Sequence, residues 1–231
     1  MRSGLLSPLT ALILLLTACA PIPTPIPQPS PHPLVVVLDP LLEPIRPLLA
    51  ACLPASYGLY ETEPAVPADA RLDWGDPSTA TASPFRFILG SEQIAWIVNP
   101  ANPAASLTLD QLRQIYAGGA NPPASGLVAW SYPPENAARI LLTRVVGWQI
   151  LLPSSVHIAA NPAQMLKSVA ADPGAIGYIP LRWVDASVRT LTITGMDAAS
   201  LSQPILASTT SSPDGAIKDW LLCIQEKLGK K

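Results

Sequence analysis

Side chains that could do catalytic or metal-binding chemistry are sparse in this sequence. It has two histidines, His32 and His157, and three cysteines, Cys19, Cys52 and Cys223. A structural zinc site needs Cys and His ligands clustered at short spacings, and no such cluster is present. His157 lacks a Gly-x-Ser-x-Gly motif or paired carboxylates beside it, so we interpret it as a strand-end or surface residue. The sequence therefore predicts no enzyme activity, no metal site and no cofactor.

The elements that must position any site alternate between strand and helix. Short apolar runs predict strands at residues 34–38, 93–98, 175–179 and 190–194. Helices are expected up to Cys52, after the capping box of Thr108 and Gln111, from Pro134, from Asn161 and after Ser212. This order is typical of an α/β protein with a largely parallel sheet.

Composition and charge narrow the function classes. The 231 residues include 14 Lys and Arg against 16 Asp and Glu, and only 13% of the residues are charged. No basic stripe is present, so binding to DNA or RNA is not expected. A hydrophobic content of 49% at this length is enough for one large or two small domains with a buried core.

The N-terminus carries a targeting signal. Arg2 precedes an apolar segment, Leu5 to Leu16, that is too short to remain in a bilayer as a helix, which indicates a signal peptide. The following Leu16-Thr17-Ala18-Cys19 resembles the lipobox of bacterial lipoproteins. That resemblance implies removal of residues 1–18, acylation of Cys19 and anchoring to the bacterial cell membrane on its extracytoplasmic side. The alternative is an ordinary signal peptide with an incidental cysteine.

A proline-rich stretch follows the lipobox. Every second residue from Pro21 to Pro33 is proline, a pattern that favours extended polyproline II and cannot pack a core. We interpret residues 19–33 as a lipidated stalk and expect the folded part to begin near residue 34.

Two blocks of the folded part resemble a known family. Residues 95–120 read AWIVNPANPAASLTLDQLRQIYAGGA, and residues 164–195 read QMLKSVAADPGAIGYIPLRWVDASVRTLTITG. Both are similar, in order and spacing, to the phosphate-binding lipoproteins of bacterial ABC transporters, which are type II periplasmic binding proteins with a PBP-like domain. The chain is identified as a divergent member.

The resemblance implies a two-lobed α/β fold with two crossing hinge strands and a ligand in the cleft between the lobes. The crossings would be residues 93–100 and 175–181. Lobe one would hold residues 34–97 and 182–231, and lobe two residues 98–181. The family architecture returns the C-terminus to lobe one, so a disulfide between Cys52 and Cys223 is expected.

The loops that hold phosphate in this family are not matched here. Family members bind the anion with Ser-, Thr- and Gly-rich loops at helix N-termini. The first loop is Asp39-Pro40-Leu41 in this chain, and the third, residues 131–136, reads SYPPEN, with two prolines and a carboxylate. The phosphate residues therefore do not carry over, and the ligand is expected to be neutral, cationic or larger than phosphate.

Other polar residues near the implied cleft are candidates for ligand binding. Trp74 could stack on a ligand and Ser78 or Thr79 could donate hydrogen bonds, although Trp74 packed in the core is the competing interpretation. Glu135 and Arg139 have the spacing of an ion pair along one helix. The candidates are Asp39, Trp74, Asp76, Ser78, Thr79, Ser131, Tyr132, Asn136 and Arg139.

These features together predict an extracytoplasmic solute-binding lipoprotein of a phosphate-type ABC transporter. It would be a monomer whose partners are a small-molecule solute, an ABC permease and, through its lipid, the membrane. The alternative is a degenerate PBP-like domain that acts as a cell-surface sensor or interaction module without transport.

Overall fold

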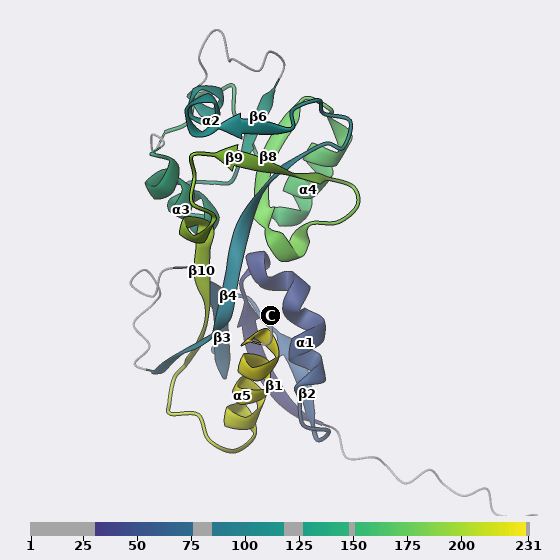
Figure 1. Ribbon diagram of the computed structural model, residues 1–231. Helices are drawn as coiled ribbons and strands as arrows, with labels where there is room; N and C mark the ends of the chain where they lie inside the picture. Colours follow the sequence, from purple (N-terminus) through teal and green to yellow (C-terminus); the bar gives the residue numbers. More distant parts are fainter. Residues whose placement is uncertain (1–30, 76–84, 118–126, 148–150, 230–231) are drawn as a thin grey trace, which may run out of the picture. The chain divides into compact units, whose positions relative to one another are not determined.

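A computed structural model describes residues 31–75, 85–117, 127–147 and 151–229 of the chain. Its strands join in one mixed sheet in the order β2-β1-β3-β10-β4-β8-β6-β7, and two further strands, β9 and β5, extend from β4 (Figure 1). The strands are β1 (His32–Leu38), β2 (Tyr57–Glu61), β3 (Ala70–Trp74), β4 (Phe85–Val98), β5 (Ser106–Thr108), β6 (Val128–Ser131), β7 (His157–Ile158), β8 (Ala175–Pro180), β9 (Arg189–Thr194) and β10 (Ser202–Thr209).

Helices pack on this sheet along its length. The α-helices are α1 (Arg46–Ala51), α2 (Leu109–Tyr116), α3 (Ala137–Val146), α4 (Pro162–Ala171) and α5 (Gly215–Gly229), and the 3-10 helices are η1 (Pro40–Ile45), η2 (Leu181–Trp183) and η3 (Ala198–Leu201). Among the described residues, no helix combines the length and the apolar character needed to span a membrane.

The first half of the sheet is built around β1. Its apolar residues pair in parallel with β2 on one side and β3 on the other, and β10 then runs antiparallel between β3 and β4. Helix α5 packs against β4 and α1. The expected disulfide joins the two helical segments: Cys52 and Cys223 are bonded, with 5.7 Å between their Cα atoms.

Strand β4 connects the two halves of the sheet. Its first residues, up to Gln93, pair with β10, and its last residues, Ile94 to Val98, pair with β8. In Figure 1 this long strand runs from the β1–β3 region to the β6, β8 and β9 region. One chain segment therefore contributes to both halves of the sheet and provides one of the crossings.

The second half of the sheet holds β8 at its centre. All six residues of β8 are buried, and β6 pairs with it in parallel. Helix α4 packs closely on β8: a Cβ atom added to Gly177 would lie 2.5 Å from the sulfur of Met165. Only glycine fits this strand position without a shift of the Met165 and Val169 side chains.

The mixed pairing departs from the expected, largely parallel sheet. Strand β10 runs antiparallel to both of its neighbours, β3 and β4, and β4 also runs antiparallel to β8. Strand β9 also pairs with β5 and with the last residues of β4. It therefore lies with the second half, whereas the expected lobe boundaries place residues 182–231 in lobe one.

Helix starts follow the capping residues in the sequence. Thr108 and Gln111 form the predicted capping box of α2, and Asn161 caps α4. Helix α3 begins two residues later than Glu135, because the Asn136 side chain accepts a hydrogen bond from the Ala138 N–H and acts as the N-cap. That start places Glu135 and Asn136 in a loop.

Candidate ligand-binding cleft

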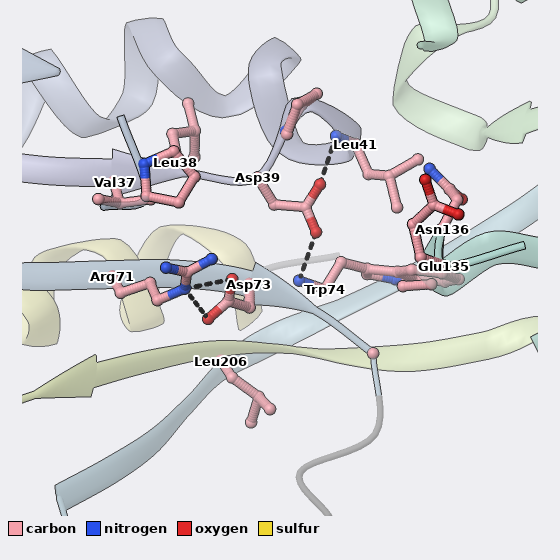
Figure 2. A pocket seen from close by; sticks show the side chains of 14 residues that line it. Val37, Leu38, Asp39, Leu41, Arg71, Asp73, Trp74, Glu135, Asn136 and Leu206 are labelled. Atoms are coloured by element: carbon pink, nitrogen blue, oxygen red, sulfur yellow. Dashed lines mark hydrogen bonds and ion pairs between the residues drawn. The ribbon is translucent and has the colours of Figure 1, made fainter. Parts of the chain in front are cut away.

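A cavity of about 370 Å³ lies where the two halves of the sheet meet. One wall comes from the ends of β1 and β3 and the start of η1, and the other from Glu135, Asn136 and Ala137 at the start of α3 (Figure 2). Gly75 and Ala137 approach closely, since a Cβ atom on Gly75 would lie 3.4 Å from the Ala137 Cβ. The cavity is lined by Val37, Leu38, Asp39, Pro40, Leu41, Pro64, Arg71, Asp73, Trp74, Gly75, Glu135, Asn136, Ala137 and Leu206.

Asp39 follows β1 directly, so its position is fixed by the buried strand before it. Its carboxylate accepts one hydrogen bond from the Leu41 N–H at 2.9 Å and a longer one from the Trp74 N–H at 3.4 Å (Figure 2). Burial raises the pKa of Asp39 to about 6, and the two backbone hydrogen bonds only partly offset that effect. The neighbouring Asp73 carboxylate raises this pKa further, and Arg71 lowers it.

Arg71 and Asp73 form an ion pair on the floor of the cavity. Side chains two residues apart on a strand lie on the same face, and the Arg71 Nε is 2.9 and 3.0 Å from the two oxygens of Asp73. Asp73 thus neutralises the guanidinium. Arg71 is not among the residues predicted from the sequence, although the alternating Ala70–Trp74 strand places it beside Asp73 and could have indicated it.

Trp74 is a core residue that also forms part of the cavity wall. Only 2% of it is exposed, and its indole N–H donates a hydrogen bond to the Glu92 carbonyl at 3.0 Å. The Trp74 ring therefore packs in the core, as the alternative to ligand stacking expected. Its backbone N–H, rather than its ring, meets the Asp39 carboxylate.

Three of the predicted ligand residues are turned away from the cavity. Ser131 is buried, and its hydroxyl lies 2.7 Å from the Tyr178 hydroxyl. Tyr132 is also buried, and its carbonyl accepts a hydrogen bond from Arg139, whose side chain packs inside the second half. In β6, Ala129 and Ser131 are the buried positions, so the alternation of the strand directs Ser131 into the core.

The other predicted ligand-binding residues either line the cavity or lie outside the described residues. Asp39, Trp74 and Asn136 line the cavity. Asp76, Ser78 and Thr79 lie outside the described residues, as does the predicted lipidation site Cys19.

A buried charge pair at the crossing supports the cavity wall. Glu92 on β4, only 1% exposed, pairs with Arg182 on η2 and also accepts a hydrogen bond from the Arg182 N–H at 3.2 Å. The neighbouring Trp183 donates its indole N–H to the Leu41 carbonyl at 3.0 Å. Strand β4 and the η2 segment are therefore bonded to Trp74 and Leu41, the two residues whose N–H groups donate to the Asp39 carboxylate.

The cleft presents carboxylates, a side-chain amide, apolar surface and a guanidinium already paired with a carboxylate. Within the described parts of the chain, no group of three or more His, Cys, Asp or Glu residues could hold a metal ion. Two sheet halves joined by crossing strands, with a cavity at their junction, define the class of two-lobed binding folds.

Comparison with known proteins identifies the family. Residues 79–203 match the PBP superfamily domain, and the chain belongs to this family. The resemblance found in the sequence and the two-lobed mixed α/β fold are thereby confirmed. No curated protein sequence matches the chain significantly.

Solved structures share the fold at low sequence identity. A candidate phosphate ABC transporter substrate-binding protein from Clostridium perfringens, solved with bound phosphate, has a TM-score of 0.70 at 20% identity, covering 84% of this chain and 93% of that one. The reduced OxyR regulatory domain from Pseudomonas aeruginosa has a TM-score of 0.62 at 15% identity, covering 85% of this chain and 96% of that one. The same fold thus occurs in a transport protein and in a regulator.

Proposed function

We propose that this protein is a lipid-anchored, extracytoplasmic solute-binding protein of a phosphate-type ABC transporter. The observation that carries the proposal is the cavity of about 370 Å³ at the junction of the two sheet halves. Its volume falls within the range of small-molecule sites. Closure of the lobes around the solute would be a hinge motion at the crossing strands, and an ABC permease would recognise the closed form.

The N-terminal sequence supports the proposed location. Residues 1–18 have the features of a signal peptide, and Cys19 follows a lipobox-like sequence. The Cys52–Cys223 disulfide also fits an extracytoplasmic protein, since disulfides persist in oxidising compartments. We expect Cys19→Ala to abolish labelling by radioactive palmitate and to leave unprocessed precursor. Full labelling of this variant would show that Cys19 is not the lipidation site.

A ligand screen tests the binding function. The wild-type protein and the cleft variant Ala137→Trp would be heated with phosphate, other oxyanions, amines, sugars and amino acids. A true ligand at 100 times its dissociation constant adds about 2.7 kcal/mol to the unfolding free energy. We expect at least one solute to raise the melting temperature of the wild type but not of Ala137→Trp.

Ala163→Trp is the matched control, because it places the same large side chain on an exposed alanine in the first turn of another helix, α4. It should respond to the solute as the wild type does. A screen without any stabilising solute, or one in which Ala137→Trp responds equally, would contradict cleft binding.

A sensor or interaction module without transport is the second candidate. The observation that favours it is that the Leu41 N–H in the cavity wall is already bonded to the Asp39 side chain, and the Ala138 N–H, directly after the wall residue Ala137, to the Asn136 side chain. The OxyR regulatory domain shows that a related fold can serve regulation. A transporter gene pair next to this gene would favour transport, whereas a solitary gene or a sensor kinase neighbour would favour the second candidate.

A further inference from the structure

Asp39 holds two backbone N–H groups from different segments of the cavity wall. One belongs to Leu41, two residues along, and the other to Trp74, 35 residues along. Both residues line the cavity, and Figure 2 shows the carboxylate lying between them. The Leu41 N–H donates to one carboxylate oxygen and the Trp74 N–H to the other.

This arrangement is chemically that of a bound anion. Oxyanions such as phosphate and sulfate are bound in proteins largely by N–H donors that converge on separate oxygens. Here the two oxygens of Asp39 occupy such donors, and the anion is covalently part of the chain. The opposite wall shows a similar arrangement, because the Asn136 side-chain oxygen accepts the Ala138 N–H at 2.9 Å.

The other charged groups of the cavity do not offer a free oxyanion a replacement for the N–H groups that Asp39 occupies. Asp73 pairs with Arg71 through both of its oxygens, and Glu135 adds a further carboxylate on the facing wall. A free oxyanion that enters the cavity therefore meets occupied donors and two carboxylates, those of Asp39 and Glu135, that are not neutralised by the Arg71–Asp73 pair.

We propose that Asp39 is the specificity-determining residue of the cleft, an internal anion that occupies the Leu41 and Trp74 N–H groups and thereby excludes free oxyanions. This inference rests on the proposed function only because it takes the cavity as the ligand site. Two effects contribute to the exclusion, the negative charge and the occupation of the donors, and they can be separated by substitution.

Three variants separate the two effects. Asp39→Ala removes both the charge and the acceptor oxygens. Asp39→Asn removes the charge but keeps an oxygen that can accept the Leu41 N–H. Glu135→Gln removes a charge from the opposite wall, and among the described residues the Glu135 side chain accepts no hydrogen bond from a backbone N–H. It is therefore the matched control for charge alone.

The test is isothermal titration of the full chain, purified in mild detergent at about pH 7.5, with inorganic phosphate and with sulfate. We expect Asp39→Ala to bind both anions at least about tenfold more tightly than the wild type. Asp39→Asn and Glu135→Gln should each gain less than Asp39→Ala. Circular dichroism verifies that each variant is folded, and Asp39→Ser, whose single hydroxyl is too short to reach both donors, replaces Asp39→Ala if the latter does not fold.

Two results would overturn the inference. Equal gains in Asp39→Ala and Glu135→Gln would show that only the overall charge of the cleft excludes anions. Weaker phosphate binding in Asp39→Ala would show that Asp39 instead accepts the proton of a protonated phosphate; sulfate, which carries no such proton, would then be unaffected. A failed solute screen together with a gain in Asp39→Ala would contradict the proposed function but not this inference.

Discussion

At the scale of single residues, Asp39 combines a buried charge with hydrogen bonds that fix its orientation. Its carboxylate ties the end of β1 to the start of η1 and to the end of β3 through the Leu41 and Trp74 N–H groups. Burial nevertheless disfavours the charged form, since the pKa of Asp39 is raised to about 6. Keeping the Asp39 carboxylate ionised in the cleft wall therefore lowers the stability of the folded protein.

The raised pKa predicts a pH-dependent effect of Asp39→Asn. A carboxyl group with a higher pKa in the folded state stabilises the fold below its unfolded pKa, and this stabilisation is lost as the pH rises from about 4 through 6. The asparagine side chain cannot ionise. The free energy of unfolding of the variant should therefore be about 1–3 kcal/mol higher than that of the wild type at about pH 7.5, and the difference should shrink toward about pH 4. Urea denaturation across this range measures the difference, and a difference that does not change with pH would contradict the prediction.

The site could be predicted from sequence only where a residue directly follows a strand or begins a helix. Asp39 follows β1 and Asn136 caps α3, and both line the cavity. Ser131 and Tyr132 stand in an equally polar segment but turn inward, because the alternation of β6 and the packing around Tyr178 determine their direction. The pairing of Arg71 with Asp73 is a local relation along β3, but the position of this pair in the cavity depends on tertiary packing, so Arg71 was missed.

At the scale of elements, the close packing of α4 on β8 predicts a sensitive glycine. A methyl group at Gly177 would meet the Met165 sulfur at 2.5 Å and Val169 at 3.0 Å, so Gly177→Ala should destabilise the protein by about 1–3 kcal/mol. Gly229→Ala is the matched control, because no atom lies within 4 Å of its added Cβ. Thermal unfolding of both variants tests this, and equal melting temperatures would show that the Met165 and Val169 side chains adjust without cost.

The disulfide between the α1 and α5 segments joins residues with a sequence separation of 171. Loop-closure entropy gives an upper limit of about 5 kcal/mol for its contribution to stability. Replacing both Cys52 and Cys223 by serine should lower the denaturant midpoint, and reduction of the wild type should have a similar effect. Unchanged unfolding of the double variant would mean that the bond adds nothing to stability.

Helices were easier to predict from sequence than the sheet topology. The capping box at Thr108 and the Asn161 cap are local signals, and both helices begin where those signals indicate. Strand β10 was missed, because Pro204 and serines interrupt its apolar run. Antiparallel pairing of β4 and β10 joins residues as far apart in the chain as Phe85 and Thr209, a relation that no local pattern carries.

At the scale of the whole folded part, the protein has the two-lobed PBP-like fold, and the residues of its cleft predict weak binding of phosphate. The fold is that of the PBP superfamily domain, with a cavity between the sheet halves. The described residues that line the cavity include three carboxylates, Asp39, Asp73 and Glu135, and a single cation, Arg71. An unpaired carboxylate about 4 Å from an anion costs about 4 kcal/mol per unit charge at an effective dielectric of 20, roughly three powers of ten in affinity.

Isothermal titration of the wild-type protein with inorganic phosphate tests this account most directly. The charge and the occupied N–H groups of the cleft predict a dissociation constant weaker than about 100 μM. A sub-micromolar constant would contradict the account, since it would require donors that the described cleft does not offer.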